Sequence, residues 1–142
     1  MRGVAKKFEI VEHPADVGFI AYGATLGELL ENAALAMMSL GCEMTAIEER
    51  ERREIRASGA DHESLLFDWL AEILAMADAE GLALRRAEVT WADEGAAHGV
   101  VYGEKFDKVR HRAGTYIKAV TYHELRVERT AEGWKGRVYL DV

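Results

Sequence analysis

Two segments of this chain repeat apolar residues at helical spacing, and each follows a residue suited to cap a helix. Thr25 precedes the first segment, and Glu28 completes a capping box in which each side chain bonds a free backbone N–H. Asp61 precedes the second, and Gly41 and Gly81 are natural stops. The spacing predicts two amphipathic helices, with stripes at Leu26, Leu29, Leu30, Ala33, Met37 and Leu40, and at Leu66, Trp69, Leu70, Ile73, Leu74 and Ala77.

The rest of the chain alternates apolar and polar residues, a pattern typical of strands. In the clearest case Ala87, Val89 and Trp91 should share one face. The candidates are residues 8–12, 17–23, 53–57, 85–93, 98–104, 116–130 and 134–142, with a hairpin turn at 131–133. Two helices and these strands predict an α+β fold, a two-layer α/β sandwich in which both helices pack on one face of a mostly antiparallel sheet.

The length of the chain indicates the number of domains, and its cysteine content indicates the cellular location. A chain of 142 residues fits one domain, expected to span residues 1–142, and can bury a core without disulfides. Cys42 is the only cysteine, which suits a reducing, cytoplasmic location. It follows a predicted helix end, where an inert buried thiol is favoured over a nucleophile. No signal-peptide pattern and no apolar run of membrane-spanning length is expected.

The charge balance bears on binding partners. The chain has 25 acidic and 18 basic residues and a formal net charge of −7. Unaided nucleic-acid binding is therefore not expected, because it needs a cationic surface against the phosphate backbone. The arginines at 50–56 alternate with glutamates, as on a solvated face. A cleaner basic cluster, and a candidate contact patch, is formed by Lys105, Lys108, Arg110 and Arg112.

Motifs of common enzymes are not found. The sequence has no phosphate-binding loop, no serine in a nucleophile elbow and no His-x-x-x-His pair. Simple alternation puts His123 on the apolar face of the strand predicted over 116–130. We favour a hydrogen-bonded core histidine, or a bulge that turns it outward, over a ligand or acid–base group.

Three positions could form an oxygen-rich site. Asp16 closes the polar stretch Glu12-His13-Pro14-Ala15-Asp16, where an aspartate is usually a turn or cap residue. Asp141 could pair with Arg137 on the same face of the last strand, and the terminal carboxylate of Val142 is adjacent. If tertiary contacts bring all three together, they suit Ca²⁺ or Mg²⁺. From the residues alone both interpretations stay open.

Long stretches of the chain resemble the archease family in that family's order. The segments are "VEHPADVGFIAYGATLGELLENAALAMMSL", with its His-x-Ala-Asp-x-Gly motif, "DHESLLFDWLAEILAMADAEGL", "KAVTYHELRVER" and the final "LDV". The similarity runs over about Phe8 to Val142. Pro14 departs from the pattern, since the family more often has threonine there.

The resemblance implies a function. Archeases are cytoplasmic accessory proteins that activate the GTP-dependent RNA ligase of tRNA splicing and RNA repair, by promoting its guanylylation and multiple turnover. They are not ligases themselves. The family binds a divalent cation, usually calcium, and its ligands fall on Asp16, Asp141 and Val142. Two alternatives remain: a metal-dependent hydrolase that uses Asp16, Asp141 and His13 or His123, and a chaperone-like binding module with a structural metal.

Overall fold

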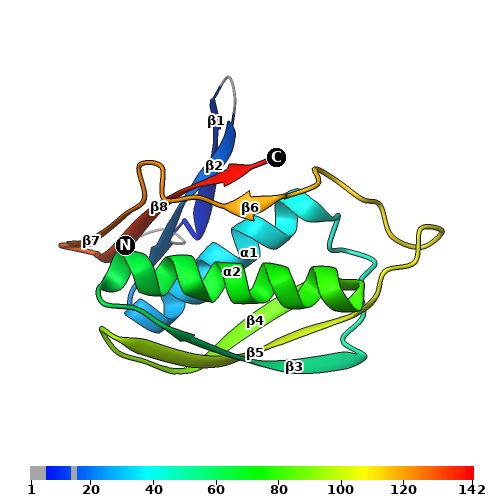
Figure 1. Ribbon diagram of the computed structural model, residues 1–142, viewed down its shortest axis with the longest axis horizontal. Helices are drawn as coiled ribbons and strands as arrows, with labels where there is room; N and C mark the ends of the chain where they lie inside the picture. Colours follow the sequence, from blue (N-terminus) through cyan, green and yellow to red (C-terminus); the bar gives the residue numbers. More distant parts are fainter. Residues whose placement is uncertain (1–5, 14–15) are drawn as a thin grey trace, which may run out of the picture.

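The computed structural model describes residues 6–13 and 16–142, which form two helices between two antiparallel sheets (Figure 1). Apolar side chains from both sheets and both helices join one core cluster, which contains Phe19, Leu29, Ile55 and Trp69. The elements are β1 Phe8–His13, β2 Asp16–Gly23, α1 Leu26–Gly41, β3 Glu51–Ser58, α2 His62–Glu80, β4 Leu82–Ala92, β5 Ala96–Lys105, β6 Ala119–Val120, β7 Arg126–Thr130 and β8 Gly133–Asp141.

The strand order places β8 at the centre of the larger sheet. That sheet runs β1-β2-β8-β6, with β7 also paired to β8, and the smaller sheet runs β3-β5-β4. Every recorded strand pair is antiparallel. The predicted α+β class, with two amphipathic helices and a mostly antiparallel arrangement, is confirmed. The predicted single sheet with both helices on one face is wrong: the strands form two sheets with the helices between them. Alternation shows which residues share a face, but it does not show which strands pair.

Both predicted helices begin at their predicted caps. The Glu28 N–H donates to Oγ1 of Thr25 over 3.1 Å, and at α2 Asp61 and Ser64 form a full capping box. Gly81 ends α2 in the left-handed conformation, with φ of 66°, which glycine adopts without steric cost. In α1, Gly41 is the last helical residue and Cys42 is the extended cap. Among the described residues, neither helix is long and apolar enough to cross a bilayer.

The strand predicted over 116–130 is wrong in its middle. The structure has the short β6, then a turn, then β7; the Leu125 N–H donates to the Tyr122 carbonyl over 3.2 Å, and Glu124 has φ of 50°. Hydrogen bonding within this turn ends the alternation on which the prediction rested. His123 therefore lies in the turn, and its side chain is 53% exposed. The core-histidine alternative is therefore wrong, and the outward orientation that was the other alternative is produced by a turn rather than by a bulge.

A register shift in β4 explains a second difference. Val89 pairs with Gly99 but Trp91 pairs with His98, so Thr90 is an extra residue on this strand. Such a bulge changes the face of the residues that follow it. Val89 packs against the core, whereas Trp91 is 53% exposed and stacks on the His98 ring. The prediction that Trp91 shares a face with Ala87 and Val89 is therefore wrong.

Candidate functional site

Two of the three predicted ligand positions lie at adjacent strand ends. Asp16 is the first residue of β2 and Asp141 is the last of β8. The two strands pair up to Val17 and Leu140, so each aspartate is the next residue beyond that pair. In an antiparallel ladder, residues that oppose each other point to the same face. The register thus assigns both carboxylates to one face at one end of the sheet.

The backbone of Asp141 is held from the β6 side as well. Asp141 pairs with Ala119, and its carbonyl accepts the Lys118 N–H over 2.8 Å. These bonds fix the end of β8 against β6, so the Asp141 side chain projects from an ordered backbone. The ion pair recorded for Arg137 is with Glu124, at 3.5 Å, and its Nε also donates to the Glu124 carbonyl over 3.1 Å. Arg137 is thus engaged away from Asp141.

Gly18 and Tyr139 lie on the same face as the two aspartates. They pair directly, two residues inside the strand ends. A Cβ on Gly18 would stand 2.6 Å from Cδ1 of Tyr139 and 2.6 Å from the Val138 carbonyl oxygen, far inside contact distance. The Tyr139 side chain is buried over β2 as a result. The glycine of the His-x-Ala-Asp-x-Gly motif is therefore required for the packing that seats the strand ends.

The strand-end site is open to solvent. Asp16 is half-buried, Asp141 is exposed and Val142 is 36% exposed. Five cavities formed by described residues lie elsewhere, with other linings. Pro14 and the side chain of His13 lie outside the described residues. Within the described chain, no three His, Cys, Asp or Glu side chains are grouped to hold a metal. The predicted set is of a different kind, since its third member is the expected carboxylate of Val142 rather than a side chain.

The donor chemistry of these positions fits a hard cation. Ca²⁺ takes six to eight oxygen ligands, including carboxylates and backbone carbonyls, in flexible geometry. Two aspartates on one face of adjacent strands would repel each other, and a divalent cation offsets that repulsion. The exposure of Asp141 leaves room for water or a partner's oxygen atoms to complete the shell.

His123 lies beside this face, next to Tyr139 and Glu124. Its ring centroid is 5.6 Å from that of Tyr139, and its Nε2 is 3.2 Å from Oε2 of Glu124. The backbone N–H of His123 donates to Oγ1 of Thr121 over 3.3 Å. The histidine is thus a surface residue of the turn between β6 and β7.

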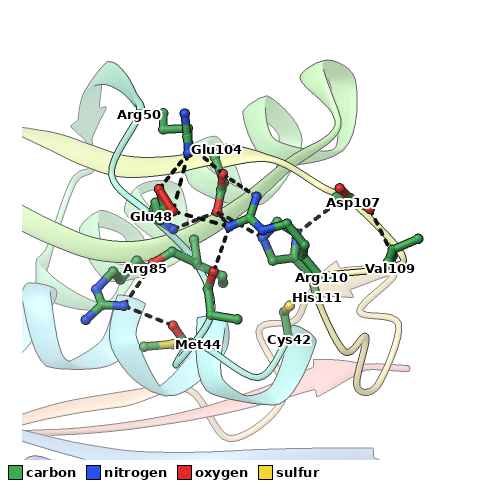
Figure 2. Close-up of polar contacts among 12 residues, drawn as sticks. Cys42, Met44, Glu48, Arg50, Arg85, Glu104, Asp107, Val109, Arg110 and His111 are labelled. Carbon is green, nitrogen blue, oxygen red and sulfur yellow. Dashed lines mark hydrogen bonds and ion pairs between the residues drawn. The ribbon is translucent and has the colours of Figure 1, made fainter.

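A buried polar network that the sequence analysis did not foresee surrounds Glu104, the residue before the end of β5 (Figure 2). Its carboxylate is nearly inaccessible and accepts from the Glu48 N–H over 2.7 Å and from Arg110 Nη2 over 3.0 Å. Arg50 Nε lies 3.2 Å away and His111 Nε2 3.0 Å away. The network joins the segment before β3 to the segment after β5.

The hydrogen bonds define the state of His111. Its Nδ1 accepts the Asp107 N–H over 2.9 Å, so the proton of the neutral ring is on Nε2 and is donated to Glu104. The Arg110 guanidinium, then the Glu48 N–H and His111, hold the pKa of Glu104 at about 2, well below the ordinary 4.5. Burial raises the pKa of the nearby Cys42 thiol, in line with the predicted inert cysteine.

The only sequence signal for this network is the acidic residue within the apolar strand 98–104. A charged residue at a buried strand position needs partners, and the basic residues that supply them follow at once. Arg110, which we placed in a candidate contact patch, donates hydrogen bonds to the buried Glu104. The network consists of groups that satisfy one another, so it is a structural clamp rather than a reactive site.

Comparison with known proteins decides the family. The model of the "Archease protein family (MTH1598/TM1083)" matches residues 8–142. The chain belongs to the archease family. The protein archease of Methanosarcina acetivorans is 40% identical over 100% of both chains, and that of Pyrococcus abyssi is 35% identical over 96% of this chain and 99% of its own.

Solved archease-family structures have the same fold. The solution structure of Methanobacterium thermoautotrophicum protein 1598 superposes with a TM-score of 0.82 at 34% identity, covering 96% of this chain and 99% of that one. A Thermotoga maritima archease, described as a possible chaperone, gives a TM-score of 0.66 at 24% identity over the whole of both chains, a likeness of fold alone. The resemblance noted in the sequence is thus confirmed at the level of the family.

Proposed function

We propose that this protein activates a GTP-dependent RNA ligase in the cytoplasm by promoting guanylylation and multiple turnover of that ligase. The observation that carries the proposal is the pairing of β2 with β8, which puts Asp16 and Asp141 of the family's motifs at adjacent strand ends. Family membership over residues 8–142 supports the same reading. The ligase that joins 3′-phosphate or 2′,3′-cyclic phosphate ends to 5′-hydroxyl ends is the partner expected from the resemblance.

The strand-end site is proposed to hold Ca²⁺, or another divalent cation, through Asp16, Asp141 and the carboxylate of Val142. A bound ion supplies concentrated positive charge and free coordination positions at the surface. The protein's own part is to orient the ligands: β2 and β8 fix the two aspartates, and the Lys118 N–H fixes the Asp141 carbonyl. An exposed site of this kind suits contact with a second macromolecule.

Exposure also favours an activator over a metal-dependent hydrolase. A hydrolase site needs a pocket that excludes water and a base near the reacting atoms. Asp141 is exposed at the end of β8 rather than enclosed. The candidate base His123 is a surface residue of a turn, engaged with Glu124. These features support an accessory protein that is not itself an enzyme.

The negative charge of the chain is compatible with an accessory protein whose partner, rather than the protein itself, binds the RNA. A net charge of −7 repels the phosphate backbone at long range and attracts a basic, RNA-binding protein. We accordingly expect no direct RNA binding by this protein alone.

Ligase assays test the proposal. Multiple-turnover joining of RNA ends is measured with the partner ligase, GTP and metal, with and without this protein. The proposal expects a rise in the number of joined ends per ligase molecule and no joining or cleavage by this protein alone. Equal turnover in both reactions, or metal-dependent RNA hydrolysis without ligase, would exclude the activator role.

A further inference from the structure

The connection from β5 to β6, residues 106–118, gathers exposed apolar side chains. Seven large apolar side chains are exposed among the described residues, and three of them belong to this connection: Phe106 at 42%, Val109 at 88% and Tyr116 at 69%. The segment lies along one side of the molecule, beside the C-terminal end of α2, in yellow to orange in Figure 1. Such a concentration on a small protein marks an interaction surface.

An apolar cavity of about 390 Å³ opens beside this segment. Met37 and Met38 of α1, Leu74 and Ala77 of α2, and Phe106 and Tyr116 contribute to its lining. The volume lies in the range of ligand pockets, and methionine side chains adapt to differently shaped guests. Two of the exposed aromatic residues therefore form part of the wall of a cavity that can accept an apolar group.

Most of this connection, together with Lys105 at the end of β5, is cationic within an acidic protein. Residues 105–116 contain Lys105, Lys108, Arg110 and Arg112 against Asp107, so their net charge is 4 − 1 = +3. The whole chain carries −7, so the other residues sum to −7 − 3 = −10. A local positive surface on an acidic protein selects an acidic partner and repels a basic one.

The segment is held in place before any partner arrives. The Phe106 N–H donates to the Gly81 carbonyl over 2.8 Å, and the Thr115 N–H donates to the Leu40 carbonyl over 2.9 Å. Arg110 and the buried His111 anchor the middle to Glu104, as Figure 2 shows. A surface already fixed loses little entropy on binding. The segment thus has the properties of a docking surface rather than of a loose loop.

From the cavity, the exposed side chains and the charge, we propose that residues 105–116 dock an acidic segment of a partner protein, which inserts one apolar side chain into the cavity. The inserted side chain acts as the buried anchor of the interface, and Lys108 and Arg112 meet the acidic residues around it. Arg112 Nε lies 3.8 Å from Oε2 of Glu43, but its side chain is 85% exposed and stays accessible to a partner. This surface is distinct from the strand-end site, and the inference does not rest on the proposed function.

A protein segment fits the surface better than RNA does. Arg110 is already engaged by Glu104 and lies 3.6 Å from Glu48, and Lys105 Nζ donates to the Glu80 carbonyl over 2.8 Å. RNA binding draws its affinity from many free cations along the backbone. The cavity lining is mostly apolar, which suits a hydrocarbon or aromatic side chain.

Peptide binding to the full chain tests the proposal. The probe is a fluorescein-labelled 12-residue peptide of aspartate and glutamate with one central phenylalanine, followed by fluorescence polarisation at low and moderate salt. We expect saturable binding that weakens with salt. Replacing the phenylalanine by serine should weaken binding at least about tenfold, since the anchor contributes 1.4 kcal/mol or more. An RNA 12-mer of matched charge should bind more weakly than the phenylalanine peptide.

Two variants separate the charge from the cavity. Lys108→Glu with Arg112→Glu reverses the exposed charge and should weaken peptide binding at least about tenfold, whereas Arg52→Glu with Arg56→Glu, the same charge change on β3, should not. Ala77→Phe fills the cavity and should abolish the preference for phenylalanine over serine. Thermal unfolding checks that each variant is folded.

The proposal is overturned by any of three results. The first is no saturable binding of the phenylalanine peptide. The second is equal binding of the phenylalanine and serine peptides. The third is RNA binding as tight as that of the peptide and lost in the same charge variant, which would make the surface a polyanion site.

Discussion

Tyr139 occupies the space that a side chain on Gly18 would need, and the two residues pair directly across β2 and β8. Gly18 is two residues after Asp16, and Tyr139 is two residues before Asp141. Because side chains alternate along a strand, all four residues belong to one face of the sheet. The packing of Tyr139 against a glycine therefore sets how the two strand ends approach each other.

Gly18→Ala should destabilise the protein by about 1–3 kcal/mol, because its Cβ would overlap the Tyr139 ring and the Val138 carbonyl. Urea unfolding measures the change. The matched control is Gly27→Ala in α1, where the added Cβ meets Val89 Cγ1 at 3.4 Å. That variant should be neutral or more stable by up to about 1 kcal/mol, because alanine favours a helix. Equal stability of Gly18→Ala and the parent would contradict the packing described.

Asp16→Asn and Asp141→Asn should each weaken Ca²⁺ binding at least about tenfold, since each removes a charged ligand. Calorimetric titration measures the affinity. Both variants should keep the melting temperature of the metal-free parent within a few degrees, because both positions are at strand ends. Glu72→Gln, which removes one exposed acidic charge on α2, is the control and should bind as the parent does. Undiminished affinity in either aspartate variant removes that residue from the ligand set.

An extension of a few residues after Val142 should weaken metal binding while the protein stays folded. The extension turns the expected terminal carboxylate into a neutral peptide group, and it leaves the strand pairs of β8 intact. The same calorimetric titration, with far-ultraviolet circular dichroism for the fold, compares the two forms. If the extended protein binds Ca²⁺ as tightly as the parent, the Val142 carboxylate is not a ligand.

Glu104→Gln should lower the free energy of unfolding at neutral pH and make it depend less on pH between 2 and 4.5. The pKa of Glu104 is about 2 in the folded protein against an ordinary 4.5, so its charged form is favoured by folding. Its contribution is therefore complete above about pH 4.5 and is lost as the pH falls toward 2. Urea unfolding between pH 2 and 7 measures the effect. The control is Glu88→Gln, which removes an exposed partner of Arg86. A pH profile of Glu104→Gln parallel to that of the parent would contradict the assigned role.

The helices were predictable because their signals are local. Thr25, Asp61 and Gly81 act within one turn, and the apolar stripes follow a fixed period. The turn that breaks 116–130 was not predictable, because it depends on hydrogen bonds of Thr121 and Tyr122 that compete with the strand. The bulge at Thr90 is likewise invisible to a pattern of alternation.

The candidate site was predictable only in part. Asp16 and Asp141 came from motifs, and the register of β2 with β8 gives a physical reason for their pairing. The clamp around Glu104 was missed because its members are far apart in sequence, from Glu48 to His111, and because basic residues were assigned to the surface by default. Partners of a buried charge become visible only once the fold is known.

The most direct test of the central claim is guanylylation of the partner ligase by labelled GTP, with the parent protein, Asp16→Asn or Glu72→Gln added at equal concentration and fixed Ca²⁺. The account predicts that the parent and Glu72→Gln raise the yield of guanylylated ligase over repeated turnovers, and that Asp16→Asn, though folded, does not. Stimulation by Asp16→Asn equal to that of the parent would contradict activation through the strand-end site.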